Sequence, residues 1–134
     1  MAALTASAAV ALLSMVAGYS LGRGQPKRVE ERIRRTLKKS EELRKRFLDL
    51  VDLDARAYLQ VAVARSGSAQ KKRAAKRKAA AVPGEVARLC LKAMDLTPLL
   101  VTRGNPNLLS DVEVAVELLF AAYKSAMINV RVNQ

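Results

Sequence analysis

The chain has 134 residues, a formal net charge of +12, one cysteine and no histidine. The lack of histidine excludes His-based acid–base catalysis and His metal sites, and a single cysteine excludes an internal disulfide and a Cys-cluster zinc site. Hydrophobic residues form 51% of the sequence, too many for a disordered polycation, whereas 6 Gly and 4 Pro are too few for a β-sandwich. We therefore predict one all-α domain over residues 1–134, without a metal, in a reducing compartment such as the cytoplasm.

The first predicted helix runs from Met1 to Leu21, a stretch that holds no charged residue. An apolar run of about 20 residues is long enough to span a bilayer. This run, however, is rich in Ala and Ser, has few large aliphatic residues, and is not preceded by the basic segment of a signal peptide. We expect a buried helix at the centre of a bundle, with a membrane anchor as the alternative.

The second predicted helix is unusually long. After a break at Gly22, Gly24 and Pro26, residues 27–64 contain no Gly or Pro and repeat apolar residues at spacings of three and four. Such a helix would be about 57 Å long, whereas a globular monomer of this size has a radius of gyration of about 14 Å. One protomer cannot cover the whole apolar stripe, so we predict an elongated helical bundle that assembles as a dimer.

Asp54 interrupts this stripe, because it shares a helix face with Phe47, Leu50, Tyr58 and Val61. A carboxylate that faces a core is costly unless it is paired or protonated. Two interpretations stay open. Asp54 is either a buried structural acid paired with an Arg of a neighbouring helix, or a carboxyl group with a raised pKa that transfers protons near neutral pH.

The middle of the chain is strongly basic. Residues 65–68 are predicted to form a joint, residues 69–81 a short basic helix, and Pro83-Gly84 a break before the next helix. No acidic residue lies within the basic run Lys71, Lys72, Arg73, Lys76, Arg77 and Lys78. A run of this kind is usually a solvated helix face. No aromatic residue interleaves with it, so it offers no stacking platform for single-stranded nucleic acid, and non-specific phosphate binding stays open.

A turn rich in Gly, Asn and Pro is predicted at residues 102–109. Turn formation alone explains its composition. Asn107 and Ser110 nevertheless offer hydrogen-bonding groups near a helix N-terminus, where anions are favoured, and Arg103 adds a positive charge. Residues 110–113 read Ser-x-x-Glu, which predicts a capping box at the start of the last helix. The segment is therefore a second candidate polar site.

The last predicted helix carries an apolar stripe from Val112 to Val130. Asn129 adjoins this stripe, and Asn133 follows four residues later on the same face. An amide beside an apolar stripe needs hydrogen-bond partners, so this pair marks a further polar position.

Taken together, these segments resemble the cyclodeaminase/cyclohydrolase family of folate enzymes. The matching residues keep the family's order over nearly the whole chain: Leu21-Gly22, residues 50–58, Val82-Pro83, residues 104–111 and Asn129-Val130-Arg131. The resemblance implies an all-helical dimer with a folate site in a groove near the subunit interface. Family members usually carry a Pro-Gly-Gly-Gly-containing segment before the first helix, whereas this chain starts at Met1-Ala2-Ala3. A shortened, inactive homologue is therefore one expected alternative.

The family's reactions, cyclodeamination of a formimino-folate and cyclohydrolysis of a methenyl-folate, move a proton to or from nitrogen or water. A carboxyl group can do this without histidine or metal. On the resemblance, we expect Asp54 to be the catalytic acid–base, and Arg103, Asn105, Asn107 and Asp111 to bind a tetrahydrofolate derivative, with no other cofactor. The basic run would attract the anionic glutamyl tail. The alternative from another class is a helical nucleic-acid-binding protein that uses the +12 charge.

Overall fold

The chain forms four long helices, two short ones and no strand. In the computed structural model, which describes residues 1–134, the long helices are α1 (Ala2–Tyr19), α2 (Lys27–Ala64), α3 (Ala69–Met94) and α5 (Leu109–Val132). The short ones are α4 (Thr97–Arg103) and a single 3-10 turn, η1 (Pro106–Leu108). The prediction of an all-α fold is confirmed.

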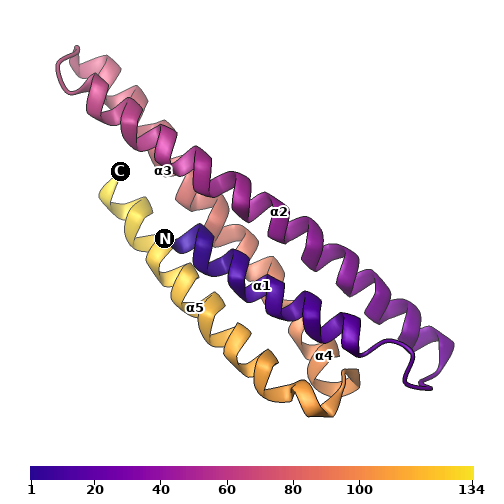
Figure 1. Ribbon diagram of the computed structural model, residues 1–134. Coiled ribbons are helices and arrows are strands. Elements are labelled where there is room, and N and C mark those ends of the chain that lie inside the picture. The colour runs from indigo at the N-terminus through magenta and orange to yellow at the C-terminus, as the bar shows by residue number, and fades with distance from the viewer.

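The long helices lie side by side in an elongated bundle (Figure 1). Each packs mainly against two neighbours, so that the bundle closes in the order α1, α2, α3, α5, and α1 also touches α3. The N-terminus lies beside the middle of α2, whereas the C-terminal end of α5 reaches further toward the tip of the α2–α3 hairpin (Figure 1). Beyond these two ends, α2 and α3 continue together as an antiparallel hairpin with its tip at residues 65–68.

The core is aliphatic and gathers around α1. This helix is long and apolar enough to cross a membrane by length and composition, but half of its 18 residues are buried inside the bundle. Ala6, Ala9 and Leu13 are fully enclosed, and the two alanines lack the bulk to hold neighbouring helices apart. The prediction of a buried helix at the centre of the bundle is confirmed only in part, because one face of α1 stays exposed.

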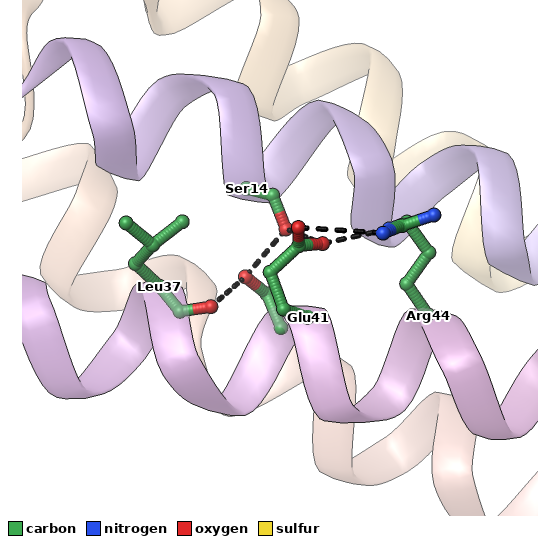
Figure 2. A network of polar contacts seen from close by, with 5 residues as sticks. Ser14, Leu37, Glu41 and Arg44 are labelled. Atoms are coloured by element: carbon green, nitrogen blue, oxygen red, sulfur yellow. Dashed lines mark hydrogen bonds and ion pairs between the residues drawn. The ribbon is translucent and has the colours of Figure 1, made fainter.

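A network of polar contacts attaches α1 to α2 (Figure 2). The hydroxyl oxygens of Ser14 and Ser40 lie 2.7 Å apart, and Ser14 also donates to the Glu41 carboxylate at 3.1 Å. Arg44 Nε donates to the same carboxylate at 2.7 Å. This guanidinium is the main reason that the pKa of Glu41 lies below its usual range. The network fixes the register of α1 against α2.

The predicted long helix from Lys27 to Ala64 is confirmed as α2. The bundle covers one face of α2 up to Leu50, and Ile33, Phe47 and Leu50 are fully buried. Between residues 51 and 64, however, Ala57 is the only buried residue. One protomer therefore leaves about the last third of α2 largely uncovered, as the length of the helix predicted.

The predicted break at Pro83-Gly84 is wrong, because α3 runs without interruption from Ala69 to Met94. Proline has no N–H to donate to the carbonyl of Ala79, which ordinarily ends or kinks a helix. Here Pro83 and Ala79 are both buried, so packing against α2 and α5 holds the segment helical. As a result, the basic run at residues 71–78 belongs to a long, fixed helix.

The predicted capping box at the start of the last helix is also wrong. α5 begins at Leu109, so Ser110 lies inside the helix, and no side chain caps the N-terminus of α5. The side-chain oxygen of Asn105 instead accepts a hydrogen bond from the backbone N–H of Asn107 at 3.0 Å. Asn105 thereby starts η1, which leads directly into α5.

Candidate functional site

A groove of about 440 Å³ opens where the α2–α3 hairpin passes the end of α5. Three helices and two residues that directly follow them line it: Asp54, Ala57, Tyr58 and Val61 of α2, with Arg65 after it, Lys76 and Ala79 of α3, and Asn129 and Val132 of α5, with Asn133 after it. The fold therefore places the Asp54 carboxylate in one groove with two amides from the far end of the sequence.

Asp54 lies on the predicted face of α2 but does not face a core. It continues the stripe of Phe47 and Leu50, yet its side chain is exposed. The prediction of burial is wrong, because α1 begins beside the middle of α2 and leaves the stripe beyond that point open (Figure 1). None of the chain's ion pairs includes Asp54, so its carboxylate lines the groove without a charged partner from this chain.

Two asparagines on α5 are the residues that sequence reasoning did not assign to this site. Asn133 Nδ2 donates to the backbone carbonyl of Asn129 at 2.9 Å, while the Asn129 side chain is exposed beside the groove. Tyr58, one turn after Asp54, is 67% exposed and adds a phenol group to the lining. The sequence offered two signals for this region, the spacing of the asparagines and the family resemblance of Asn129-Val130-Arg131, and neither shows that the asparagines meet Asp54.

The groove continues toward the hairpin tip into a second hollow of about 580 Å³, with which it shares Val61, Arg65 and Lys76. The lining of this hollow contains four cations and no acid: Arg65, Lys72, Arg73 and Lys76. None of these cations takes part in an ion pair. The combined groove thus has a carboxylate and amides at one end and four unpaired positive charges at the other.

The basic run divides between faces of the hairpin. Lys72, Arg73 and Lys76 line the groove, whereas Lys71 lines a separate hollow beside Leu59. Arg77 and Lys78 line neither hollow. Only half of the run can therefore contact a molecule bound next to Asp54.

The other predicted site residues lie at the opposite end of the bundle. Asp111 and Asn129 both belong to α5, 18 residues apart in sequence, so about 27 Å separates them along the helix axis. Arg103 ends α4 and is exposed, and the Asn107 side chain is exposed as well. The structure therefore does not bring Arg103, Asn107 and Asp111 to Asp54 within one protomer.

Asn105 has a structural role. Its backbone N–H donates to Ser20 Oγ at 2.7 Å, and its Nδ2 donates to the Tyr19 carbonyl at 3.2 Å. Ser20 is buried and donates in turn to the Val16 carbonyl at 2.6 Å. These bonds fasten the turn before α5 to the end of α1, in agreement with turn formation as the explanation for this segment.

Other reactive groups lie away from the groove. Burial raises the pKa of the Cys90 thiol to about 12, so this cysteine is held in its protonated form inside the core. No group of three or more Cys, Asp or Glu side chains is arranged to hold a metal ion. Asp54 is the carboxylate that lines the groove.

Comparison with known proteins gives consistent results. The sequence profile of the formiminotransferase-cyclodeaminase family matches residues 1–134. A methenyltetrahydrofolate cyclohydrolase from Methylorubrum extorquens is 32% identical over 142 residues, covering 98% of this chain and 68% of that protein. The crystal structure of formiminotetrahydrofolate cyclodeaminase from Thermotoga maritima superposes with a TM-score of 0.94 at 30% identity, covering 98% of this chain and 67% of that one.

Proposed function

Because the chain belongs to the formiminotransferase-cyclodeaminase family, we propose that it is a cytoplasmic enzyme acting on formimino- or methenyl-tetrahydrofolate. One similar protein is named a cyclohydrolase and another a cyclodeaminase, so both reactions are candidates. The observation that carries the proposal is the groove in which the unpaired Asp54 carboxylate lies with Asn129 and a row of cations.

The proposed chemistry is proton transfer by Asp54. In cyclodeamination, a folate nitrogen attacks the formimino carbon, one C–N bond forms, and ammonia leaves. The Asp54 carboxylate would accept the proton of the attacking nitrogen and return it to the departing one. In cyclohydrolysis it would accept a proton from the water that adds to the methenyl carbon. Neither sequence of steps requires histidine, which the chain lacks.

The charge along the groove supports one orientation of the substrate. The reacting carbon would lie at the Asp54 end, within reach of the Asn129 amide. The anionic glutamyl tail would extend toward Arg65, Lys72, Arg73 and Lys76, where the positive potential is concentrated.

We further propose a homodimer that completes this site. The outer face of α1 exposes a stripe without any charge: Leu4, Ala8, Ala11, Met15 and Tyr19. A continuous apolar face of this kind usually marks an interface. A two-fold axis perpendicular to α1 would place two copies of this face together and run the bundles antiparallel. The turn with Arg103, Asn107 and Asp111 in one copy would then approach the Asp54 groove of the other.

The test is a turnover assay on the purified chain with both folate derivatives, following ammonia release and the loss or gain of the methenyl chromophore. Turnover of either substrate supports the proposal and tells the two reactions apart. A folded protein that turns over neither substrate would be an inactive member of the family, and the proposed enzyme activity would be withdrawn.

A further inference from the structure

A second basic groove lies at the other end of α2, where α3 ends and the chain turns into α4. Its volume is about 570 Å³, and it is lined by Arg32, Arg35, Thr36, Lys38, Lys39 and Glu42 of α2 and by Asp95, Leu96 and Leu99 at the α3–α4 corner. Thr36 and Asp54 are 18 residues apart on α2, or about 27 Å along its axis. Within one protomer, this groove is therefore separate from the proposed folate site.

The four cations of this groove are not neutralised by the chain itself. Arg32, Arg35, Lys38 and Lys39 form no ion pair within 4.0 Å, although Glu42 and Asp95 line the same groove. The lining carries four positive charges against two negative ones. A concave surface with such an excess attracts anions from solution.

Thr36 adds a hydrogen-bond donor at the bottom of the groove. The residue is only 7% exposed, and its hydroxyl bonds to no other group of the chain. The chain contains no side-chain oxygen or nitrogen that is sealed from solvent without a partner, so the Thr36 hydroxyl opens into the groove. Because this hydroxyl has no partner within the chain, it is free to form a hydrogen bond with a molecule bound in the groove.

We propose that this groove binds a small organic phosphate. Phosphate offers three acceptor oxygens and up to two negative charges, which suit two guanidinium groups, a lysine and a hydroxyl better than the two oxygens of a carboxylate. Arg32, Arg35, Thr36 and Lys39 would hold the phosphate. The organic part of the ligand would lie against Leu96 and Leu99, which are half-buried at the corner.

The experiment uses phenyl phosphate as the probe and isothermal titration calorimetry as the readout, with phenylacetate as the carboxylate of similar shape. We expect phenyl phosphate to bind at least tenfold more tightly than phenylacetate. The triple variant Arg32→Gln/Arg35→Gln/Lys39→Gln should lose at least tenfold in affinity. Thr36→Val, which removes one hydrogen bond to a charged ligand at nearly constant volume, should lose about tenfold.

A charge-matched control separates a site from diffuse attraction. The triple variant Lys45→Gln/Arg56→Gln/Arg77→Gln removes the same charge from exposed residues outside the groove, and it should bind within twofold of the parent chain. If the two triple variants lose affinity for phenyl phosphate equally, the proposal is overturned. It is also overturned if the parent chain binds phenylacetate as tightly as phenyl phosphate. If the groove variant is poorly folded by circular dichroism, Thr36→Val alone decides.

Two further arms identify the source of the phosphate and keep the result apart from folate chemistry. If the parent chain sediments with phosphatidic acid vesicles and Thr36→Val does not, the bound phosphate is a lipid headgroup. If the parent chain does not sediment with the vesicles, the bound phosphate belongs to a soluble compound. The KM for folate should stay unchanged in the groove variants, whereas a raised KM without phenyl phosphate binding would assign the groove to the substrate and overturn the proposal.

Discussion

Arg46 on α2 holds Glu85 on α3 through two parallel hydrogen bonds, from Nε to Oε1 and from a terminal guanidinium nitrogen to Oε2, each 2.8 Å long. A bidentate pair fixes direction as well as distance. The pair lies about two helical turns from Asp54 along α2 and about two and a half from Lys76 along α3. It therefore sets the register in which the two helices enter the groove.

Glu85→Gln should lower stability in a pH-dependent way. The hydrogen bond from Arg46 is the main cause of the lowered pKa of Glu85. A carboxyl group with a lowered pKa in the folded state stabilises the fold above its unfolded pKa, and this contribution disappears as the pH falls through the folded value. We expect a loss of at most about 1 kcal/mol at pH 7, because the pair is partly exposed.

The measurement is chemical unfolding of the parent chain and the variant between pH 7 and pH 3. The difference in unfolding free energy should shrink toward zero at the acid end. Glu42→Gln is the control, because Glu42 is an exposed acid of α2 without an ion pair. A difference that stays constant with pH would show that the Arg46–Glu85 pair does not stabilise the fold.

Ala11→Glu should separate the proposed dimer into monomers. Ala11 lies in the middle of the uncharged outer face of α1 and is exposed in the protomer. A glutamate at this position should therefore not destabilise the fold of the single protomer. In an interface between two copies it would bury two like charges close to the two-fold axis. Light scattering should give a dimer for the parent chain and a monomer for the variant, with unchanged helical content. A monomeric parent chain at micromolar concentration would contradict the proposal.

Asp54→Asn should abolish turnover while leaving the fold intact. The amide has nearly the same size but cannot move a proton, and general acid–base groups contribute about 10²- to 10⁴-fold to rate. Because Asp54 is exposed and unpaired, the unfolding free energy should change by less than about 0.5 kcal/mol. Asp52→Asn is the matched control, since Asp52 is exposed on another face of α2 and should keep full activity.

The behaviour of Asp54 also shows what can be predicted from periodicity. The spacing of apolar residues gave the correct face of α2, because direction around a helix follows from local geometry alone. It predicted the wrong burial for Asp54. Whether that part of α2 is covered depends on where α1 begins along α2, and the spacing of residues within α2 does not give that position. Pro83 is a similar case, since the tertiary packing around it overrides a local helix-breaking tendency.

The composition of the site could be predicted only in part. Asp54 and the basic run were identified from patterns within single helices. The meeting of Asp54 with Asn129 in one groove depends on contacts between α2 and the end of α5, which no local pattern reveals. Asn105 was expected to bind substrate on the resemblance, whereas its bonds to Ser20 and Tyr19 explain its presence structurally.

Mixed dimers should reveal whether the site is shared between two copies. Asp54→Asn and Arg103→Gln should each lose activity for different reasons. If Arg103 of one copy serves the Asp54 groove of the other, a heterodimer contains one intact site. Random mixing after refolding should then restore about a quarter of the parent activity. If the mixture is no more active than the two single variants, either Asp54 and Arg103 serve the same protomer's site or Arg103 does not belong to the site.

The last prediction divides the basic run between substrate capture and a solvated helix face. Lys72→Gln/Arg73→Gln/Lys76→Gln and Lys71→Gln/Arg77→Gln/Lys78→Gln each remove two lysines and one arginine, but only the first set lines the groove. If the groove holds the glutamyl tail, the first variant should raise KM several-fold and leave kcat nearly unchanged, because contacts far from the reacting carbon stabilise the ground state and the transition state equally. The increase should shrink with added salt, since exposed charges are screened beyond about 8 Å at physiological ionic strength.

The control variant, Lys71→Gln/Arg77→Gln/Lys78→Gln, should keep the KM of the parent chain. Equal increases in both variants would indicate attraction by net charge alone, and no change in either would leave the whole run as a solvated surface. Duplex DNA serves as the counter-test, because binding that falls steeply with salt and weakens equally in both variants would favour the nucleic-acid alternative.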